Sequence, residues 1–249
     1  MRRLIIFLTL ILIAAALFRL RQYASNWHYI VPVEPGQLVY VATFEDGTDD
    51  WEVFDGRNTA AIRDGTMLLN VTAPEGGIYS AASPYFADFD MTVEARQVDG
   101  SPDNSFGVVF RQRDRENYYV FLISSTGFYQ VKRLVDGKSR IISNWHTTDL
   151  VNTEPGATNL LRVIGYGDHF QFFINDEPVE LCIPNDPSFE STPLATGECR
   201  DGSWQQTLID DQIPNGRIAV GLEIYPETGI TIAFDNVIVY GPQPIEDNE

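Results

Sequence analysis

The chain has 249 residues, of which 44% are hydrophobic, 12% aromatic and 21% charged, a composition that excludes long disordered and collagen-like chains. Its 17 lysines and arginines against 35 aspartates and glutamates give a net charge of −18. Nucleic-acid binding needs a positive surface, so we expect no nucleic-acid partner.

The chain opens with an uncharged apolar run, residues 4–18, which is flanked by Arg2, Arg3, Arg19 and Arg21. A helix of this length rises about 22 Å, less than the ~30 Å hydrocarbon core, but flanking arginines can snorkel to the interfaces. We expect residues 1–21 to be an uncleaved signal-anchor or transmembrane helix that meets the membrane through residues 4–20. A cleaved signal peptide is the alternative.

The distribution of charged residues indicates on which side of the membrane the rest of the chain, residues 22–249, lies. Residues 22–249 hold 13 basic and 35 acidic side chains, a net charge of −22. The positive groups before the apolar run slightly outweigh those after it, which favours a cytoplasmic amino terminus. We therefore expect an extracytoplasmic body, at the cell surface or on the periplasmic side.

Residues 22–36 contain two prolines and are expected to form a linker, and residues 242–249 an acidic tail. Between them, residues 37–241 contain ten or more short segments rich in Val, Ile, Tyr, Phe and Thr, separated by turn pairs such as Asp-Gly and Asn-Asp. Such spacing is typical of hairpins. The sequence predicts an all-β jelly-roll sandwich of two sheets.

Alternation along several segments predicts which side chains face the core. In residues 89–95, Met91, Val93 and Ala95 share one face and should point inward. Residues 118–124 are apolar on both faces, so we expect a central strand that is covered on both sides.

Cys182 and Cys199, the two cysteines of the chain, bracket a polar stretch that contains prolines. This pattern predicts a disulfide formed in an oxidising compartment. Two unpaired thiols are the alternative. No histidine or third cysteine lies nearby to complete a zinc site.

The stretches 103–137, 159–179 and 216–240 resemble the central hairpins of concanavalin A-like lectin/glucanase domains. The marks are an opening Phe-Glu-Asp-Gly followed by Trp51, a Gly-x-x-x-Arg strand, and a closing Phe-Asp-Asn-Val. Laminin-G-like domains and the bacterial 3-keto-disaccharide hydrolase domains are the most similar families. The resemblance implies a concanavalin A-like fold, in which residues 182–208 form an insertion loop, but that fold hosts several activities.

The same resemblance suggests a glycosidase-like site with Glu94 and Arg111 as candidate catalytic residues. The laminarinase pattern Glu-x-Asp-x-x-Glu is not matched at residues 88–94, where Asp comes first and the last acid arrives one residue late. Near Arg111, Phe106 interrupts the Asn-Ser-Gly turn of the hydrolase family. A strand face with solvated acids and an ion pair at Arg111 are the alternative interpretations.

Sugar rings stack on aromatic side chains that have polar groups beside them. The candidate ligand-binding residues are Tyr119, Phe128, Tyr129 and Trp145, with Arg111 and Lys132 as donors. The alternative is that these rings fill the core. Trp145 lies in a polar, loop-like stretch and is the ring most expected to be exposed.

A structural calcium ion is a further hypothesis. First and last strands often lie side by side in sandwiches, which would bring Glu45 and Asp46 close to Asp235. Carboxylates and backbone carbonyls are ligands that Ca²⁺ prefers. The alternative is that Asp235 caps a turn.

Taken together, the sequence predicts a membrane-anchored, extracytoplasmic, non-catalytic module that binds a glycan or a protein partner at the cell surface. Two alternatives remain. One is a glycosidase-like enzyme, of 3-keto-disaccharide hydrolase type. The other is an accessory subunit of a membrane protein complex.

Overall fold

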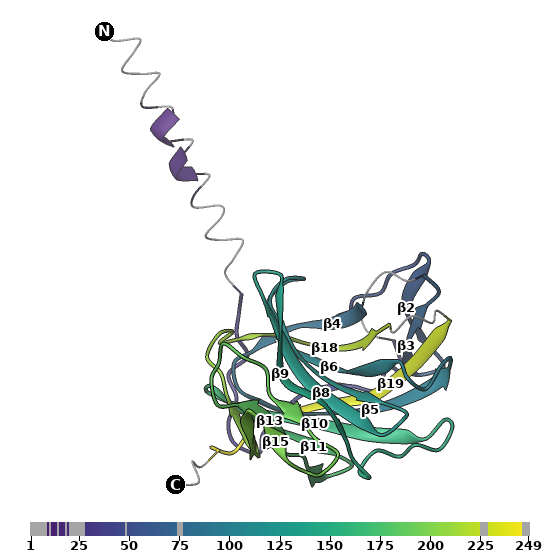
Figure 1. Cartoon of the computed structure of the whole chain (residues 1–249). Coiled ribbons are helices and arrows are strands. Elements are labelled where there is room, and N and C mark those ends of the chain that lie inside the picture. The colour runs from purple at the N-terminus through teal and green to yellow at the C-terminus, as the bar shows by residue number, and fades with distance from the viewer. Residues whose placement is uncertain are drawn as a thin grey trace. The chain divides into compact units, whose positions relative to one another are not determined.

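The structure is a computed structural model that describes residues 9, 11–13, 15–17, 19, 28–47, 49–73, 77–224 and 229–245. The chain divides into two compact units, Met1–Ile30 and Val31–Glu249 (Figure 1). The expectations for Arg2, Arg3, Arg21, the first part of the linker (residues 22–27) and the end of the tail (residues 246–249) lie outside the described residues. In the first unit, the described residues of the apolar run are helical. No helix in the described part of the chain has the length and apolarity needed to cross a membrane.

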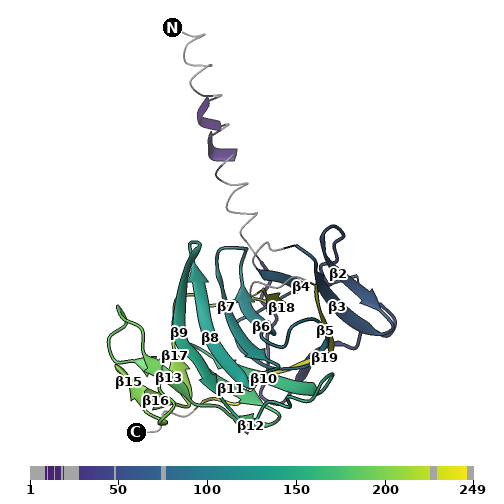
Figure 2. The same cartoon turned by 45° about the vertical axis from the view of Figure 1, so that its right-hand side comes forward.

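The second unit confirms the expected all-β sandwich. One sheet has six strands, in the order β4 (Gly77–Phe86), β18 (Gly216–Glu223), β6 (Ser105–Gln112), β7 (Tyr118–Ser124), β8 (Phe128–Val135) and β9 (Lys138–Thr147). The sheet curves, and it faces a second sheet across the core (Figure 2).

The second sheet has nine strands. Its main path is β12 (Glu177–Pro178), β11 (His169–Ile174), β10 (Thr158–Tyr166), β5 (Phe89–Asp99), β19 (Ile230–Tyr240), β3 (Thr66–Val71) and β2 (Asn58–Arg63). Two further strands join it, β1 (Leu38–Ala42) on β19 and β17 (Thr207–Ile209) on β11. The first and last strands of the unit therefore lie side by side, as expected.

Tight turns follow the sequence signals. Asp64-Gly65, Asp136-Gly137 and Asn175-Asp176 all have positive φ at both positions, which the hairpin turn of type I′ requires. Alternation orients the strands as expected. Met91, Val93 and Ala95 are buried in the core between the sheets.

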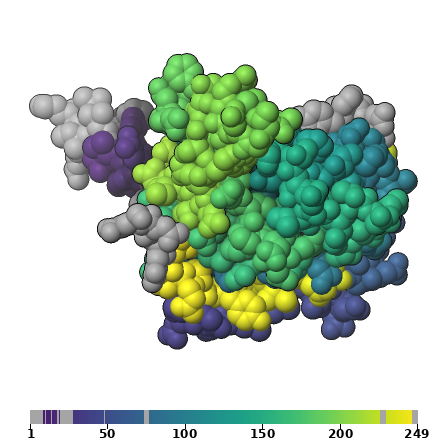
Figure 3. All heavy atoms as spheres, turned by 60° about the horizontal axis from the view of Figure 1, so that its bottom comes forward, coloured from purple at the N-terminus to yellow at the C-terminus, as the bar shows by residue number. Residues whose placement is uncertain are grey.

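The segment from 182 to 208 adds small sheets to the sandwich. β13 (Leu181–Pro184) pairs with β16 (Gly202–Gln205), and β14 (Thr192–Pro193) pairs with β15 (Cys199–Arg200). The expected disulfide joins Cys182 to Cys199 and is confirmed. In the space-filling view, this segment forms a protruding lobe, coloured light green (Figure 3).

Candidate functional site

The outer face of the six-stranded sheet carries a second, smaller apolar cluster. Ala81, Val109, Val120, Leu122 and Ala219 form it, from strands β4, β6, β7 and β18, and none is more than 3% exposed. Outward faces of antiparallel sheets are normally polar. An apolar floor on this face therefore needs a cover, which its neighbours supply.

Three aromatic side chains pack around this floor. Tyr79 of β4, Tyr118 of β7 and Trp145 of β9 are partly buried against it. The Tyr79 and Tyr118 rings lie 5.7 Å apart between centroids. Burial, followed by the nearby Glu223 carboxylate and Tyr79, raises the pKa of Tyr118 to about 12. The Tyr118 phenol is thus neutral at physiological pH and can donate a hydrogen bond.

An ion pair crosses the same face. Lys132 Nζ of β8 lies 2.5 Å from Glu223 Oε2 of β18, and the two side chains are only 16% and 24% exposed. A shallow pocket of about 70 Å³ lies beside it, with Glu223, Tyr79, Tyr118 and floor residues in its wall. We call Tyr79, Tyr118, Lys132, Trp145 and Glu223 the outer-face site.

This site holds one carboxylate on its strands, and a second lies close to it: the pKa of Tyr79 is raised by burial and by the charge of Glu52, which pairs with Arg217. The six strands of the sheet contain no aspartate and a single glutamate, Glu223. The candidate acid Glu94 is instead on β5 of the other sheet, half-buried on the side away from the core. The structure therefore does not bring together Glu94 and Arg111, and the acids of residues 88–94 are remote from the outer-face site.

Arg111 serves the packing of loops. It is 1% exposed, and its guanidinium donates to the backbone carbonyls of Ala87, Gly167 and Ile213. The Arg111 Cζ atom lies 4.6 Å from the centre of the Phe170 ring. With all three guanidinium nitrogens bonded to the protein and only 1% of the residue exposed, Arg111 has no surface from which to touch a ligand.

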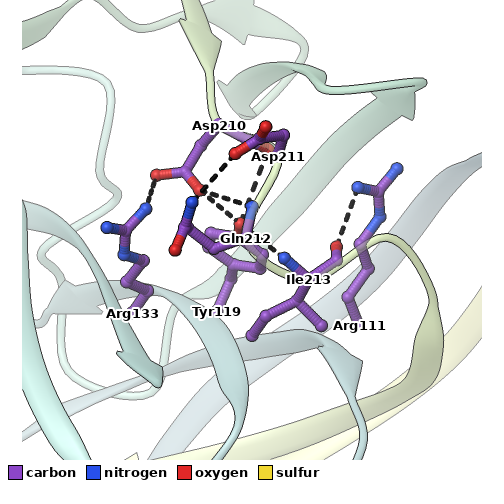
Figure 4. A network of polar contacts seen from close by, with 7 residues as sticks. All are labelled: Arg111, Tyr119, Arg133, Asp210, Asp211, Gln212 and Ile213. Atoms are coloured by element: carbon purple, nitrogen blue, oxygen red, sulfur yellow. Dashed lines mark hydrogen bonds and ion pairs between the residues drawn. The ribbon is translucent and has the colours of Figure 1, made fainter. Parts of the chain in front are cut away.

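Tyr119 also lies inside the sandwich. Its hydroxyl donates to Asp210 Oδ1 at 2.6 Å and accepts from the backbone N–H of Ile213, while Arg133 pairs with the other oxygen of Asp210. Figure 4 shows this network, which ties the loop between β17 and β18 to β7 and β8. Burial raises the pKa of the Tyr119 phenol.

Of the remaining binding candidates, Tyr129 is 3% exposed and donates to the Glu180 carbonyl, whereas Lys132 and Trp145 belong to the outer-face site. The prediction of a loop around Trp145 is wrong, because β9 extends through Thr147 and holds the indole on the outer face. Sequence reasoning missed Tyr79 and Glu223. It also chose Tyr119 over Tyr118, although the alternation along β7 already set them on opposite faces.

The acids proposed for calcium are partly brought together. The pKa of Asp235 is raised by burial and by the charges of Glu94 and Glu45. Among the described residues, no group of three or more His, Cys, Asp or Glu is arranged to hold a metal ion. Asp235 accepts from the backbone N–H of Asn236 at 2.7 Å. The calcium site, including Asp46, stays a prediction.

No protein-family model and no curated protein sequence matches this chain. Solved structures do match. A galectin-like protein of unknown function from Bacillus subtilis has a TM-score of 0.56 at 10% identity, over 84% of this chain and 98% of that one. Carbohydrate-binding module CBM66 from Bacillus subtilis has a TM-score of 0.51 at 15% identity, over 76% and 93%. A Bacillus licheniformis β-glucanase has a TM-score of 0.52 at 12% identity, over 83% and 99%. The chain therefore has the concanavalin A-like jelly-roll fold, as the sequence resemblance implied.

Proposed function

We propose that this protein is a membrane-anchored, extracytoplasmic module that binds a glycan on its outer-face site without hydrolysing it. The observation that carries the proposal is the packing of Tyr79, Tyr118 and Trp145 on one apolar floor, on the same face of the sheet as the Lys132–Glu223 pair. Aromatic faces stack on sugar C–H groups, and a few convergent donors and acceptors fix a ligand's orientation.

A non-catalytic role is favoured over a glycosidase by the acid content of the site. Glycoside hydrolysis generally needs two carboxyl groups that flank the bond. The strands beneath the site supply Glu223 alone, which Lys132 neutralises, and the neighbouring Glu52 is paired with Arg217. The β-glucanase with a similar fold is named for hydrolysis, but at 12% identity it informs the fold only.

The extracytoplasmic location is supported by two separate features of the chain. The arginine-flanked apolar run, residues 4–18, is suited to membrane insertion. The Cys182–Cys199 disulfide is typical of proteins that mature in an oxidising compartment.

The test is a glycan array probed with the full-length chain in mild detergent, followed by calorimetry on any hit. We expect Trp145→Ala and Tyr118→Ala each to weaken binding about tenfold, the equivalent of ~1.4 kcal/mol. Phe189→Ala is the matched control, because Phe189 is 65% exposed and belongs to the insertion, not to the strands that carry the site. Sugar-chain cleavage, no glycan hit, or unchanged affinity in both site variants would contradict the proposal.

A further inference from the structure

Trp145 and His146 are neighbours on β9 and point to opposite faces of the strand. Trp145 packs on the outer-face floor. The His146 ring instead meets Tyr129 edge-on, with centroids 5.7 Å apart, and lies 4.7 Å from the ring of Trp204. A second aromatic group therefore lies behind the outer-face site.

The insertion supplies Trp204, which lies on β16. Trp204 Nε1 donates to the Gly197 carbonyl at 2.9 Å, which fixes the indole. The insertion is attached to β9 by a hydrogen bond from the backbone N–H of Cys182 to Ser143 Oγ, 3.0 Å long. The disulfide closes the segment that carries Gly197. The insertion thus sets a ring beside His146 on a rigid support.

These rings form one end of a groove. Tyr129, His146, Gly197 and Trp204 line a hollow of about 310 Å³. A second hollow of about 530 Å³ shares Thr147 and Thr148 with it. A third, of about 450 Å³, shares Thr126 and Thr153 with the second and reaches Gly100. We call the three hollows together the end groove.

The end groove has a distinct chemistry. The hydroxyls of Thr147 and Thr153 have no hydrogen-bond partner within the part of the chain that the structure describes, so they are open to a ligand. The carboxylates of Asp99, Asp149, Glu154 and Glu180 lie along the groove, and no lysine or arginine is among the residues that line it. Burial lowers the pKa of His146, which is therefore neutral at pH 7.

We propose that the end groove is a second binding site, separate from the outer-face site, that takes a neutral glycan chain with one sugar stacked on Trp204. The ligand class rests on the proposed function, but the site does not. Threonine hydroxyls both donate hydrogen bonds to sugar diols and accept them, carboxylates accept them, and aromatic rings give a stacking surface. Like charge excludes uronate or sulfated chains. A cationic peptide is less suited, since only Asp149 and Glu154 share a loop, whereas Glu180 lies on another segment, and the hydroxyls of Thr126, Thr147 and Thr153 line the groove with them.

The experiment measures hydrogen exchange and calorimetric binding on the full-length chain. The probes are neutral hexasaccharides of glucose, xylose and mannose, with hexagalacturonate and pentalysine for comparison. We expect a neutral hexasaccharide to slow exchange in residues 147–157, both in the wild type and in Trp145→Ala. Trp204→Ala should abolish that protection and weaken this binding step at least tenfold. Trp204→Phe, which keeps a stacking ring and controls for folding, should retain most of both.

The outcomes separate the two sites. If Trp145→Ala removes all glycan binding while Trp204→Ala binds like the wild type, the end groove is not a site and the proposed function stands. If the reverse holds, the end groove is the glycan site and the outer-face proposal is wrong. Protection by pentalysine or hexagalacturonate alone would overturn the ligand class, and no protection by any probe would overturn the inference.

Discussion

Lys132 and Glu223 meet across two intervening strands. Their strands β8 and β18 are separated by β7 and β6, so in a flat sheet the two strands would lie about 14 Å apart, and the two residues are also four positions out of register. Both side chains must extend over the sheet to bring Nζ within 2.5 Å of Oε2. The pair therefore spans the central strands and helps to shield their outward apolar side chains from water.

Replacing one partner of the Lys132–Glu223 pair should lower the free energy of unfolding more than replacing both. Lys132→Met leaves Glu223 as a half-buried charge without its counter-ion, and we expect a loss of about 1–2 kcal/mol. Lys132→Met combined with Glu223→Met should recover most of that loss, because a matched apolar pair is compatible with the floor. A double-mutant cycle by chemical denaturation measures the coupling. Additive single effects would mean that the two charges do not interact in solution.

Gly107 marks the closest approach of β6 to β7. A Cβ atom at this position would overlap the carbonyl oxygen of Phe121. We expect Gly107→Ala to destabilise the sandwich by more than about 4 kcal/mol, because the clash is with backbone that cannot rotate away. The matched control is Gly221→Ala, whose Cβ would come no closer than 3.1 Å, to Ile78 O. Equal melting temperatures for the two variants would refute this account.

We expect Arg111 to contribute to the stability of the folded protein and not to ligand binding. Arg111→Met leaves the carbonyls of Ala87, Gly167 and Ile213 without their donor, and we expect a cost of about 3 kcal/mol. Thermal unfolding should then shift down by about 6–12 °C, since each kcal/mol is worth about 2–4 °C at this size. Glycan affinity at a temperature where the variant is folded should not change. A variant with normal stability and lost binding would restore Arg111 as a ligand-binding residue.

The strand pattern was readable from the sequence because it depends on local chemistry. Alternation in residues 89–95, and the Asp-Gly and Asn-Asp turns, act over a few residues. The site was harder to predict, since it depends on which face of the curved sheet a side chain occupies. Lys132 and Trp145 were found as polar or aromatic candidates, but Arg111 and Tyr119 are of the same residue types and face inward.

Two features of the proposed sites could be found only from the three-dimensional structure. The partner of Lys132 is 91 positions away in the sequence, so no spacing rule points to Glu223. Likewise, the pairing of β13 with β16 positions Trp204, which contacts His146 from 58 positions away in the sequence. Both proposed sites therefore depend on contacts between residues that are far apart in the sequence, and residue type alone does not predict such contacts.

Reduction of the Cys182–Cys199 disulfide should loosen the insertion selectively. In the chain-entropy model, a loop of this size is stabilised by about 3 kcal/mol, which corresponds to a roughly hundredfold change in the population of the locally open form. We expect dithiothreitol to increase protease cleavage within residues 185–200, while the sandwich resists. Cleavage is read by mass spectrometry. Unfolding of the whole domain at the same reductant concentration would show that the insertion is not an independent unit.

Asp235 offers a test of electrostatics and calcium together. Its pKa in the folded protein is raised by burial and by Glu94 and Glu45, so the folded state binds the proton more tightly than the unfolded state. The ionised carboxylate therefore costs stability at neutral pH, and the cost disappears as the pH falls through the folded pKa. We expect Asp235→Asn to raise the melting temperature at pH 7 by less than about 3 °C, with no gain below pH ~4.

The same variant tests the calcium prediction. If Ca²⁺ binds at Asp235, millimolar calcium should raise the melting temperature of the wild type by mass action, and Asp235→Asn should reduce that rise. Asp211→Asn, which changes an exposed acid on a different loop, is the control and should respond to calcium like the wild type. A wild type that is insensitive to both calcium and chelator would leave Asp235 as a carboxylate held near Glu94 and Glu45 against their repulsion, and would remove the metal site from Glu45 and Asp46 as well.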